Sequence, residues 1–109
     1  MKLPNGLNAV IPMEKLTGYC LNPSHSSGKH KARVFASALG ITAENADDLR
    51  EVIAKAALEG EVIQQGHTEF GQLCKVDWAI PDQEFIVLRT IWEISPNQPN
   101  PRLISAFIR

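Results

Sequence analysis

The sequence predicts an α+β domain in which two or three N-terminal helices pack on one face of a three- to four-stranded antiparallel sheet. Between Pro12 and Glu59, apolar side chains recur every three or four positions, which is typical of helices with one buried face. After Gly60 they recur at every second position, as on a half-buried strand. Because all helical segments precede all strand segments, the order favours a helical layer on a sheet over alternating β-α-β units.

The composition is that of one globular domain spanning residues 1–109. Of the 109 residues, 44% are apolar and 21% are charged, and a chain of this length can form one core. The net charge of −1 argues against a protein that coats nucleic acid non-specifically, because phosphate neutralisation supplies most of that affinity. No run approaches the roughly 20 apolar residues that span a bilayer. We therefore expect a cytoplasmic protein without membrane contact.

Three helices are expected before Gly60, over residues 13–20, 28–39 and about 42–59. Pro12 suits the first position of the first helix, because its missing N–H is not needed there. Ser27 can offer a side-chain oxygen to the first amides of the second helix. Gly40 follows that helix and fits a left-handed cap.

The strands are expected over residues 70–80, 84–94 and 102–108, with a weaker one over 61–65. The strand at 84–94 is apolar on both sides, which indicates a central position in the sheet. Residues 81–83 read as a hairpin turn, residues 95–101 as an exposed loop, and His67 as part of a turn.

The segment from residue 21 to 35 concentrates positive charge at the start of the second helix. Its basic side chains are His25, Lys29, His30, Lys31 and Arg33. The free amides and the positive end of the helix dipole lie at the same place, which predicts a phosphate or carboxylate site held by Lys29, Lys31 and Arg33. Lys29 and Arg33 share a helix face, whereas His30 turns roughly 100° away from that face, so not all of these residues can meet one ligand. A solvated helix start that only caps and solubilises fits the same residues.

Two strands carry polar residues where apolar ones are expected. Arg89 and Thr90 interrupt the most apolar strand, and a buried charge is costly unless it is paired or reaches water. We therefore expect Arg89 to open onto a cleft or to pair with an acid such as Glu93 or Asp77. Arg102 and Ser105 form a second pair on the last strand. Their odd separation puts them on opposite faces unless the strand is twisted or bulged.

The sequence predicts no metal site and no cofactor. Cys20 and Cys74 are far apart, and no histidine or cysteine pair has the spacing of zinc ligands. No glycine-rich phosphate loop is present. The two cysteines are expected to be buried thiols of a cytosolic protein.

Motifs along nearly the whole chain resemble one known family. They are Leu3-Pro-Asn-Gly6, Tyr19-Cys-Leu-Asn-Pro23, Gly28-Lys-His-Lys-Ala-Arg-Val-Phe35, Arg89-Thr-Ile-Trp92 and Pro101-Arg-Leu103. Together they are similar to a bacterial family of small stand-alone domains catalogued as domain of unknown function 6883. The layout of that family is similar to the barnase–EndoU–colicin–RelE group of toxin ribonucleases, in which helices precede an antiparallel sheet.

The resemblance implies a metal-independent ribonuclease that helps the RNA 2′-hydroxyl attack its neighbouring phosphate, and a small antitoxin-like protein that keeps it silent. The roles it implies are proton transfer by His25 or His30, charge stabilisation by Lys31, Arg89 and Arg102, and orientation of the phosphate by Thr90 and Ser105. The family pattern after Pro-Arg-Leu is Thr-x-Tyr. This chain instead has Ser105 and Phe107, which removes a phenol from the last strand.

A second interpretation stays open from the residues themselves. A non-enzymatic module would bind a protein or another anionic partner through the basic helix start at residues 25–33. An enzyme needs His25 or His30 within hydrogen-bond reach of a site shared with Arg89 or Arg102, whereas a binding module does not.

Overall fold

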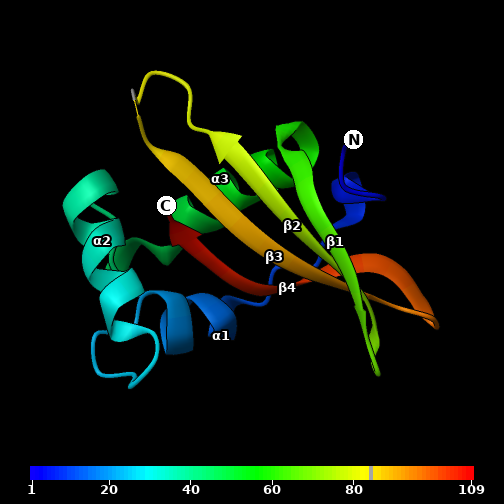
Figure 1. The fold of residues 1–109 in the computed structure, drawn as a ribbon. Helices are drawn as coiled ribbons and strands as arrows, with labels where there is room; N and C mark the ends of the chain where they lie inside the picture. Colours follow the sequence, from blue (N-terminus) through cyan, green and yellow to red (C-terminus); the bar gives the residue numbers. More distant parts are fainter. Residues whose placement is uncertain (84) are drawn as a thin grey trace.

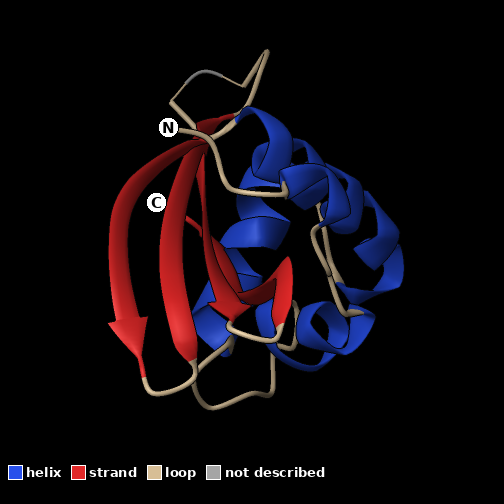
Figure 2. Ribbon diagram, turned by 90° about the vertical axis from the view of Figure 1, so that its right-hand side faces the viewer, coloured by secondary structure: helices blue, strands red, loops and turns tan. Residues whose placement is uncertain are grey.

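The computed structural model describes residues 1–83 and 85–109 and has the expected two-layer architecture (Figure 1). The helical elements are η1 (Gly6–Asn8), α1 (Met13–Lys15), the π-helical turn η2 (Leu16–Cys20), α2 (Lys29–Leu39), η3 (Ala43–Asn45) and α3 (Ala46–Glu59). The strands are β1 (Glu61–Thr68), β2 (Gly71–Ala79), β3 (Val87–Ser95) and β4 (Gln98–Ile108). The helices gather on one side of the sheet (Figure 2), which confirms the α+β class. Within the residues described, no helix is long and apolar enough to cross a membrane.

The four strands form an antiparallel meander in the order β1-β2-β3-β4. β3 is therefore central, as its apolar character predicted. Directly opposed residues of antiparallel strands project from the same face, so the register defines two faces. The inner face carries Cys74, Val76, Leu88, Thr90, Trp92, Leu103 and Ala106, all buried. The opposite face, called the outer face below, carries Leu73, Lys75, Asp77, Arg89, Ile91, Glu93, Arg102, Ser105 and Phe107.

The core lies between α3 and the inner face. α3 buries Leu49 and Ile53 completely, and α2 contributes Phe35, which is also fully buried. Gly40 ends α2 in the left-handed conformation with φ of 67°, as expected. The turn before α3 is fixed by a capping box. The Asn45 side-chain oxygen accepts a hydrogen bond from the Thr42 amide, and the Thr42 hydroxyl accepts from the backbone amides at the start of η3.

Several expected boundaries were wrong, mostly at the end of the chain. β4 begins at Gln98 rather than at residue 102, so the expected loop at 95–101 is a tight turn. β4 tolerates Pro99 and Pro101 because it is the last strand of the sheet, where a missing N–H leaves no partner strand unpaired. The Pro101 and Val10 backbones meet there, with the Val10 N–H donating to the Pro101 carbonyl oxygen at 2.8 Å.

Three smaller corrections concern the other strands. β1 extends to Thr68, so His67 lies in a strand rather than in a turn. Phe70 lies in the β1–β2 turn and is largely exposed instead of facing the core. β3 begins at Val87, and Glu84, the expected first residue, lies outside the described residues.

Candidate functional site

His25, rather than Ser27, caps the start of α2. Its Nδ1 accepts hydrogen bonds from the Ser27 and Gly28 amides at 3.0 Å each, and no side chain caps the helix at Gly28 itself. The expected Ser27 cap is therefore wrong, because the turn before α2 brings the imidazole over the amides instead. This hydrogen-bond pattern assigns the proton of the neutral ring to Nε2. His25 thus presents a donor, and not an acceptor, to any ligand.

Tyr19 lies at the centre of the polar contacts beside α2. Its ring meets the His25 ring edge-on, with centroids 4.9 Å apart and an interplanar angle of 74°. Lys31 Nζ donates a hydrogen bond to the Tyr19 hydroxyl at 2.5 Å and lies 4.7 Å from the ring centroid. No pattern in the sequence assigns a role to Tyr19, although it stands in one of the family motifs. A short segment, residues 21–28, joins η2 to α2 and brings Tyr19 against the basic start of α2. This closeness along the chain is the signal that could have revealed it.

The surroundings of the Tyr19 oxygen favour its negative form. The hydrogen bond from Lys31 lowers the pKa of the phenol below its ordinary value, and burial opposes that shift only in part. The Ser105 hydroxyl lies close enough to lower the same pKa. Yet Ser105 Oγ is buried and makes no hydrogen bond of good geometry. The unpaired Ser105 hydroxyl thus lies beside the Tyr19 phenol, which already accepts a hydrogen bond from the Lys31 ammonium.

Gly28 permits this arrangement because it has no side chain. A Cβ at this position would collide with the Tyr19 carbonyl oxygen and would stand 3.2 Å from Tyr19 Cδ1. The backbone of Gly28 is in the ordinary helical region, so the requirement for glycine comes from this close approach and not from its dihedral angles. The first turn of α2 therefore packs directly on Tyr19.

Arg89 pairs with Asp77, one of the two acids expected for it. Its Nε and Nη2 donate to the two carboxylate oxygens at 2.8 and 3.0 Å, and Arg109 Nη1 donates to Asp77 Oδ2 at 3.1 Å. These guanidinium groups hold the pKa of Asp77 below its usual range, and Asp77 raises that of Arg89. The pair fixes the Arg89 side chain on the outer face and leaves other N–H groups of its guanidinium available to a ligand.

A bulge in β4 puts Arg102 and Ser105 on the same face. Ile91 pairs with Ser105, whereas the next residue of β3, Trp92, pairs with Leu103, so β4 has one extra residue at this point. This is the bulge that Arg102 and Ser105, an odd number of residues apart, need in order to share a face. Arg102 lies opposite Glu93 and Ser105 opposite Ile91, both on the outer face.

Lys31 and Arg89 flank the end of β4. Phe107 pairs with Arg89 across the sheet, and Lys31 Nζ lies 5.3 Å from the centroid of the Phe107 ring. Lys31 and Tyr19 thus lie beside Ser105 and Phe107 of β4, and Arg89 is the cross-strand neighbour of Phe107 on the same outer face, with its guanidinium turned to Asp77 on β2. We call Tyr19, Lys31, Arg89 and Ser105 the Tyr19 cluster.

Other expected site residues lie elsewhere. Thr90 is fully buried on the inner face, where its Oγ1 accepts from Trp92 Nε1 at 2.7 Å and donates to the Val76 carbonyl at 3.4 Å. The expectation that Thr90 faces a bound phosphate is wrong, because neighbouring residues of a strand point to opposite faces. Arg102 is exposed and lies beyond the Ile91–Ser105 pair from Arg89. His30 is exposed on α2, on the helix flank next to Lys31.

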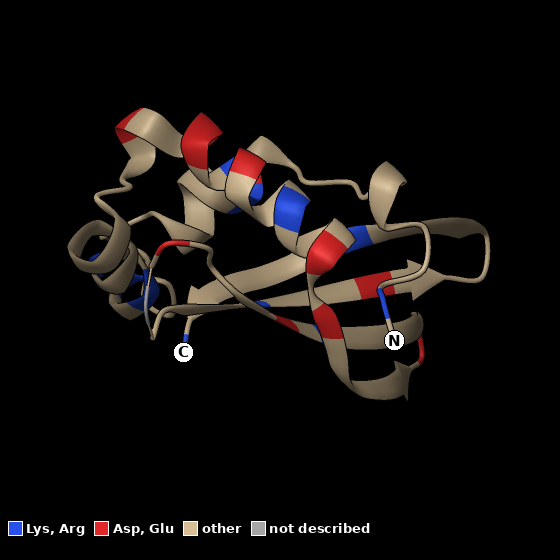
Figure 3. Ribbon diagram, turned by 90° about the horizontal axis from the view of Figure 1, so that it is seen from above, with Lys and Arg blue, Asp and Glu red and all other residues tan. Residues whose placement is uncertain are grey.

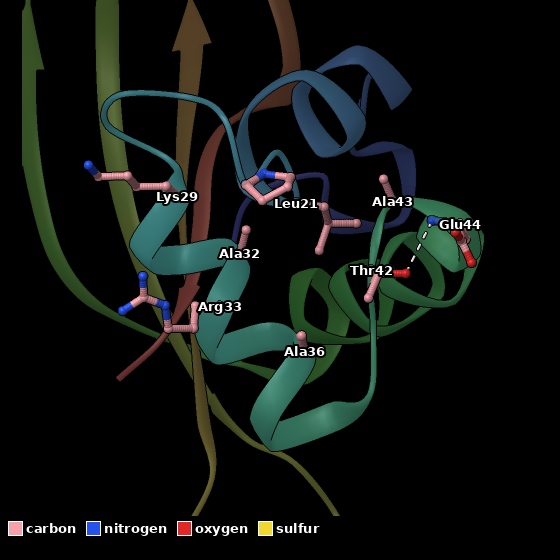
Figure 4. Close-up of a pocket in the computed structure, with 9 residues that line it drawn as sticks. Leu21, Lys29, Ala32, Arg33, Ala36, Thr42, Ala43 and Glu44 are labelled. Atoms are coloured by element: carbon pink, nitrogen blue, oxygen red, sulfur yellow. Dashed lines mark hydrogen bonds between the residues drawn. The ribbon is translucent and has the colours of Figure 1, made fainter.

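Lys29 and Arg33 line a separate groove between α2 and the turn at η3 (Figure 4). The groove has a volume of about 530 Å³, and its other lining residues are Leu21, Pro23, Ala32, Ala36, Thr42, Ala43 and Glu44. The two cations lie at its rim, on the α2 side (Figure 4). The expected anion-binding residues are therefore divided, with Lys31 in the Tyr19 cluster and the other two on a different face of the helix.

Charge is unevenly distributed although its sum is close to zero. The Lys and Arg positions of α2 lie at one end of the ribbon, near the C-terminus, whereas acidic positions follow α3, interspersed with Arg50 and Lys55, and the start of β1 (Figure 3). Among residues 1–83 and 85–109, no cluster of histidine, cysteine and acidic side chains could hold a metal ion. Cys20 and Cys74 are buried free thiols, and burial raises the pKa of each.

The comparisons with known proteins identify the family and the fold. The sequence model of the family described as Domain of unknown function (DUF6883) matches residues 2–109, so the chain belongs to this family. None of the curated proteins matches the sequence significantly. Among solved structures, the fold is similar to a chain of the contact-dependent growth inhibition toxin–immunity protein complex from Klebsiella pneumoniae 342. The TM-score is 0.70 at 13% identity, over 93% of this chain and 100% of the other.

Proposed function

We propose that this member of the family is a toxin-like, metal-independent endoribonuclease domain that cleaves RNA phosphodiester bonds on the outer face beside α2. The observation that carries the proposal is the Tyr19 cluster. It combines two cations, Lys31 and Arg89, with the buried and unpaired hydroxyl of Ser105. The fold shared with a chain of a toxin–immunity complex supports the same reading by analogy.

The cluster suits a reaction in which negative charge builds on phosphorus. When the RNA 2′-hydroxyl attacks, the non-bridging oxygens gain charge that fixed cations and donors stabilise. Arg89 is held in place by Asp77, so little reorganisation is needed to present its free N–H groups. Ser105 would donate its unused hydroxyl to one phosphate oxygen, and Arg102 would contact the backbone further along β4.

The histidines take more limited roles than the resemblance implies. His25 would donate Nε2–H to a phosphate oxygen, because its Nδ1 is already occupied by two amides. His30 remains a candidate for proton transfer from the exposed flank of α2. A small hollow of about 230 Å³ beyond Ile91, lined in part by Lys75 and Leu73, would receive a neighbouring nucleotide. The substrate would be met in the cytoplasm, where a small immunity-type or antitoxin-like partner would cover the basic end of the molecule.

The test is cleavage of total RNA by the purified protein in the presence of EDTA. We expect products that end in 2′,3′-cyclic phosphate, and a loss of cleavage in Lys31→Met. Lys55→Met, an exposed lysine on α3, is the matched control and should cleave like the wild type. Activity that disappears with EDTA would contradict the metal-independent mechanism, and equal cleavage by both variants would contradict the site.

A second function is favoured by one specific observation. Lys29 and Arg33 lie at an apolar groove away from the Tyr19 cluster, as a non-enzymatic module that binds a protein or anionic partner requires. This alternative predicts that the wild type does not cut RNA. It also predicts that an acidic protein partner is retained by the wild type and released by Lys29→Met with Arg33→Met.

A further inference from the structure

We propose that Tyr19 is the catalytic base of the reaction and that Lys31 is its acid, an assignment that rests on the ribonuclease function proposed above. The two side chains are joined by a hydrogen bond of 2.5 Å between Lys31 Nζ and the Tyr19 oxygen. They stand beside Ser105 and next to the Phe107–Arg89 pair, where the phosphate would lie. Neither residue role follows from the sequence, in which Tyr19 and Lys31 are 12 positions apart.

Apart from His30, which lies on the exposed flank of α2, the other groups in and around the Tyr19 cluster are poorly suited to accept a proton. Arg89 is always a donor. His25 already uses its free nitrogen lone pair on the Ser27 and Gly28 amides. Asp77 is the carboxylate nearest to Arg89, but both of its oxygens are engaged by Arg89 and Arg109. The Tyr19 oxygen lies next to the Lys31 ammonium, and Tyr19 is only partly buried, so this oxygen is the acceptor best placed to take the proton.

The Tyr19 ring is held in one position from several sides. His25 contacts it edge-on, Lys31 lies over its face, and the Gly28 backbone packs against it. The titratable and charged groups that face it are Lys15, 6.0 Å from the ring centroid, His25 and Lys31, with Cys20 adjacent in sequence. Lys31 lowers the pKa of the phenol most strongly, which increases the share of phenolate at neutral pH. A base is most effective when it is both positioned and partly deprotonated.

In the proposed step two protons are transferred, one P–O bond forms and one P–O bond breaks. The Tyr19 phenolate takes the proton of the RNA 2′-hydroxyl while the O2′–P bond forms. The P–O5′ bond breaks, and the Lys31 ammonium gives a proton to the departing O5′. The products are a 2′,3′-cyclic phosphate and a 5′-hydroxyl, and the proton on Tyr19 then returns to Lys31 through their hydrogen bond. No co-reactant or metal is consumed.

The first experiment measures cleavage of an oligonucleotide that has a single ribose among deoxyriboses, with EDTA present. Tyr19→Phe keeps the ring and its contacts and removes only the hydroxyl. We expect its cleavage rate to fall by about 10²–10⁴-fold, the usual contribution of a general base. Lys55→Met is again the control, and equal melting temperatures establish that Tyr19→Phe is folded.

A second substrate separates the base from the acid. Replacing the bridging 5′-oxygen by sulfur gives a thiolate leaving group that needs no proton. On this substrate we expect the deficit of Lys31→Met to shrink and that of Tyr19→Phe to remain. A deficit of Tyr19→Phe that shrinks, or one of Lys31→Met that does not, would overturn the assignment of roles.

A third measurement does not depend on activity. The chain contains one tyrosine, so tyrosinate absorbance during a pH titration reports on Tyr19 alone. We expect a midpoint below that of a free tyrosine and a higher midpoint in Lys31→Met, whereas Lys55→Met should leave it unchanged. A wild-type midpoint that Lys31→Met does not raise would overturn the proposed pair.

The outcomes distinguish the two proposals. A wild type that leaves the single ribose uncut overturns the ribonuclease function and the catalytic roles with it. A wild type that cuts while Tyr19→Phe cuts equally well overturns only the base assignment. Cleavage by the wild type, its loss in Tyr19→Phe, and a tyrosine midpoint that coincides with the rising limb of the pH–rate profile would support both.

Discussion

Replacing Thr90 and Ser105 one at a time separates a residue that holds the core from one that serves the site. Thr90→Val keeps the shape of the side chain but removes the acceptor of Trp92 Nε1–H, which is fully buried. An orphaned buried donor costs about 1–3 kcal/mol, and the added methyl group offsets part of it. We expect a net loss of about 1–2 kcal/mol in the free energy of unfolding, or a fall of about 4–8 °C in melting temperature for a domain of this size.

Ser105→Ala should give the opposite pattern. Ser105 Oγ is buried and has no hydrogen bond to lose, so its removal should leave the free energy of unfolding unchanged or slightly raised. If Ser105 orients the phosphate, RNA cleavage should fall in Ser105→Ala and persist in Thr90→Val at temperatures where both are folded. Urea denaturation and the single-ribose cleavage assay measure the two effects. A stable Thr90→Val, or a destabilised Ser105→Ala that still cuts RNA normally, would refute the reasoning from the two faces of the sheet.

Three further predictions test the packing and the charges. Gly28→Ala should lower the melting temperature and raise the tyrosine titration midpoint, because a Cβ collides with the Tyr19 carbonyl; an unchanged midpoint would contradict this contact. Phe35→Ala should cost about 3–5 kcal/mol in denaturant titrations, against under about 0.5 for Lys55→Ala; equal costs would mean that the α2 face is misassigned. The folded-state pKa of Asp77 is lowered, so its contribution to stability is present above the unfolded pKa and is lost as pH falls through the folded one. Asp77→Asn should therefore flatten the acid limb of the stability–pH curve, and an unaltered limb would argue against the Arg89 pair.

The elements of the fold were predictable because their signals are local. The change of apolar period from three or four residues to two follows from helix and strand geometry, whatever the elements pack against. The pairing of Arg89 with an acid was also predictable, because an unpaired charge in a central strand is too costly. Cap chemistry was less secure, because the sequence offers both Ser27 and His25 ahead of α2 and only the path of the turn brings the imidazole onto the Ser27 and Gly28 amides.

The face on which a strand residue lies was harder to predict at the end of the chain. One extra residue in β4 shifts the alternation of side chains between the two faces. Arg102 and Ser105 therefore lie on the same face, although their spacing in a regular strand would put them on opposite faces. The start of β4 was missed because prolines usually mark loops, whereas a strand at the sheet edge can accept them. Both features depend on which strand lies alongside, which the local pattern does not encode.

The sequence by itself determined the fold class, the central position of β3, the absence of a metal-binding spacing and the concentration of cations at the start of α2. Each of these follows from periodicity, composition or the cost of burying charge. Only the tertiary structure decided that Lys31 meets Tyr19 while Lys29 and Arg33 turn to another groove, and that Thr90 belongs to the core. Such contacts join η2, α2 and β4, which are far apart along the chain. Their distances are set by packing, and packing is decided by the whole core at once.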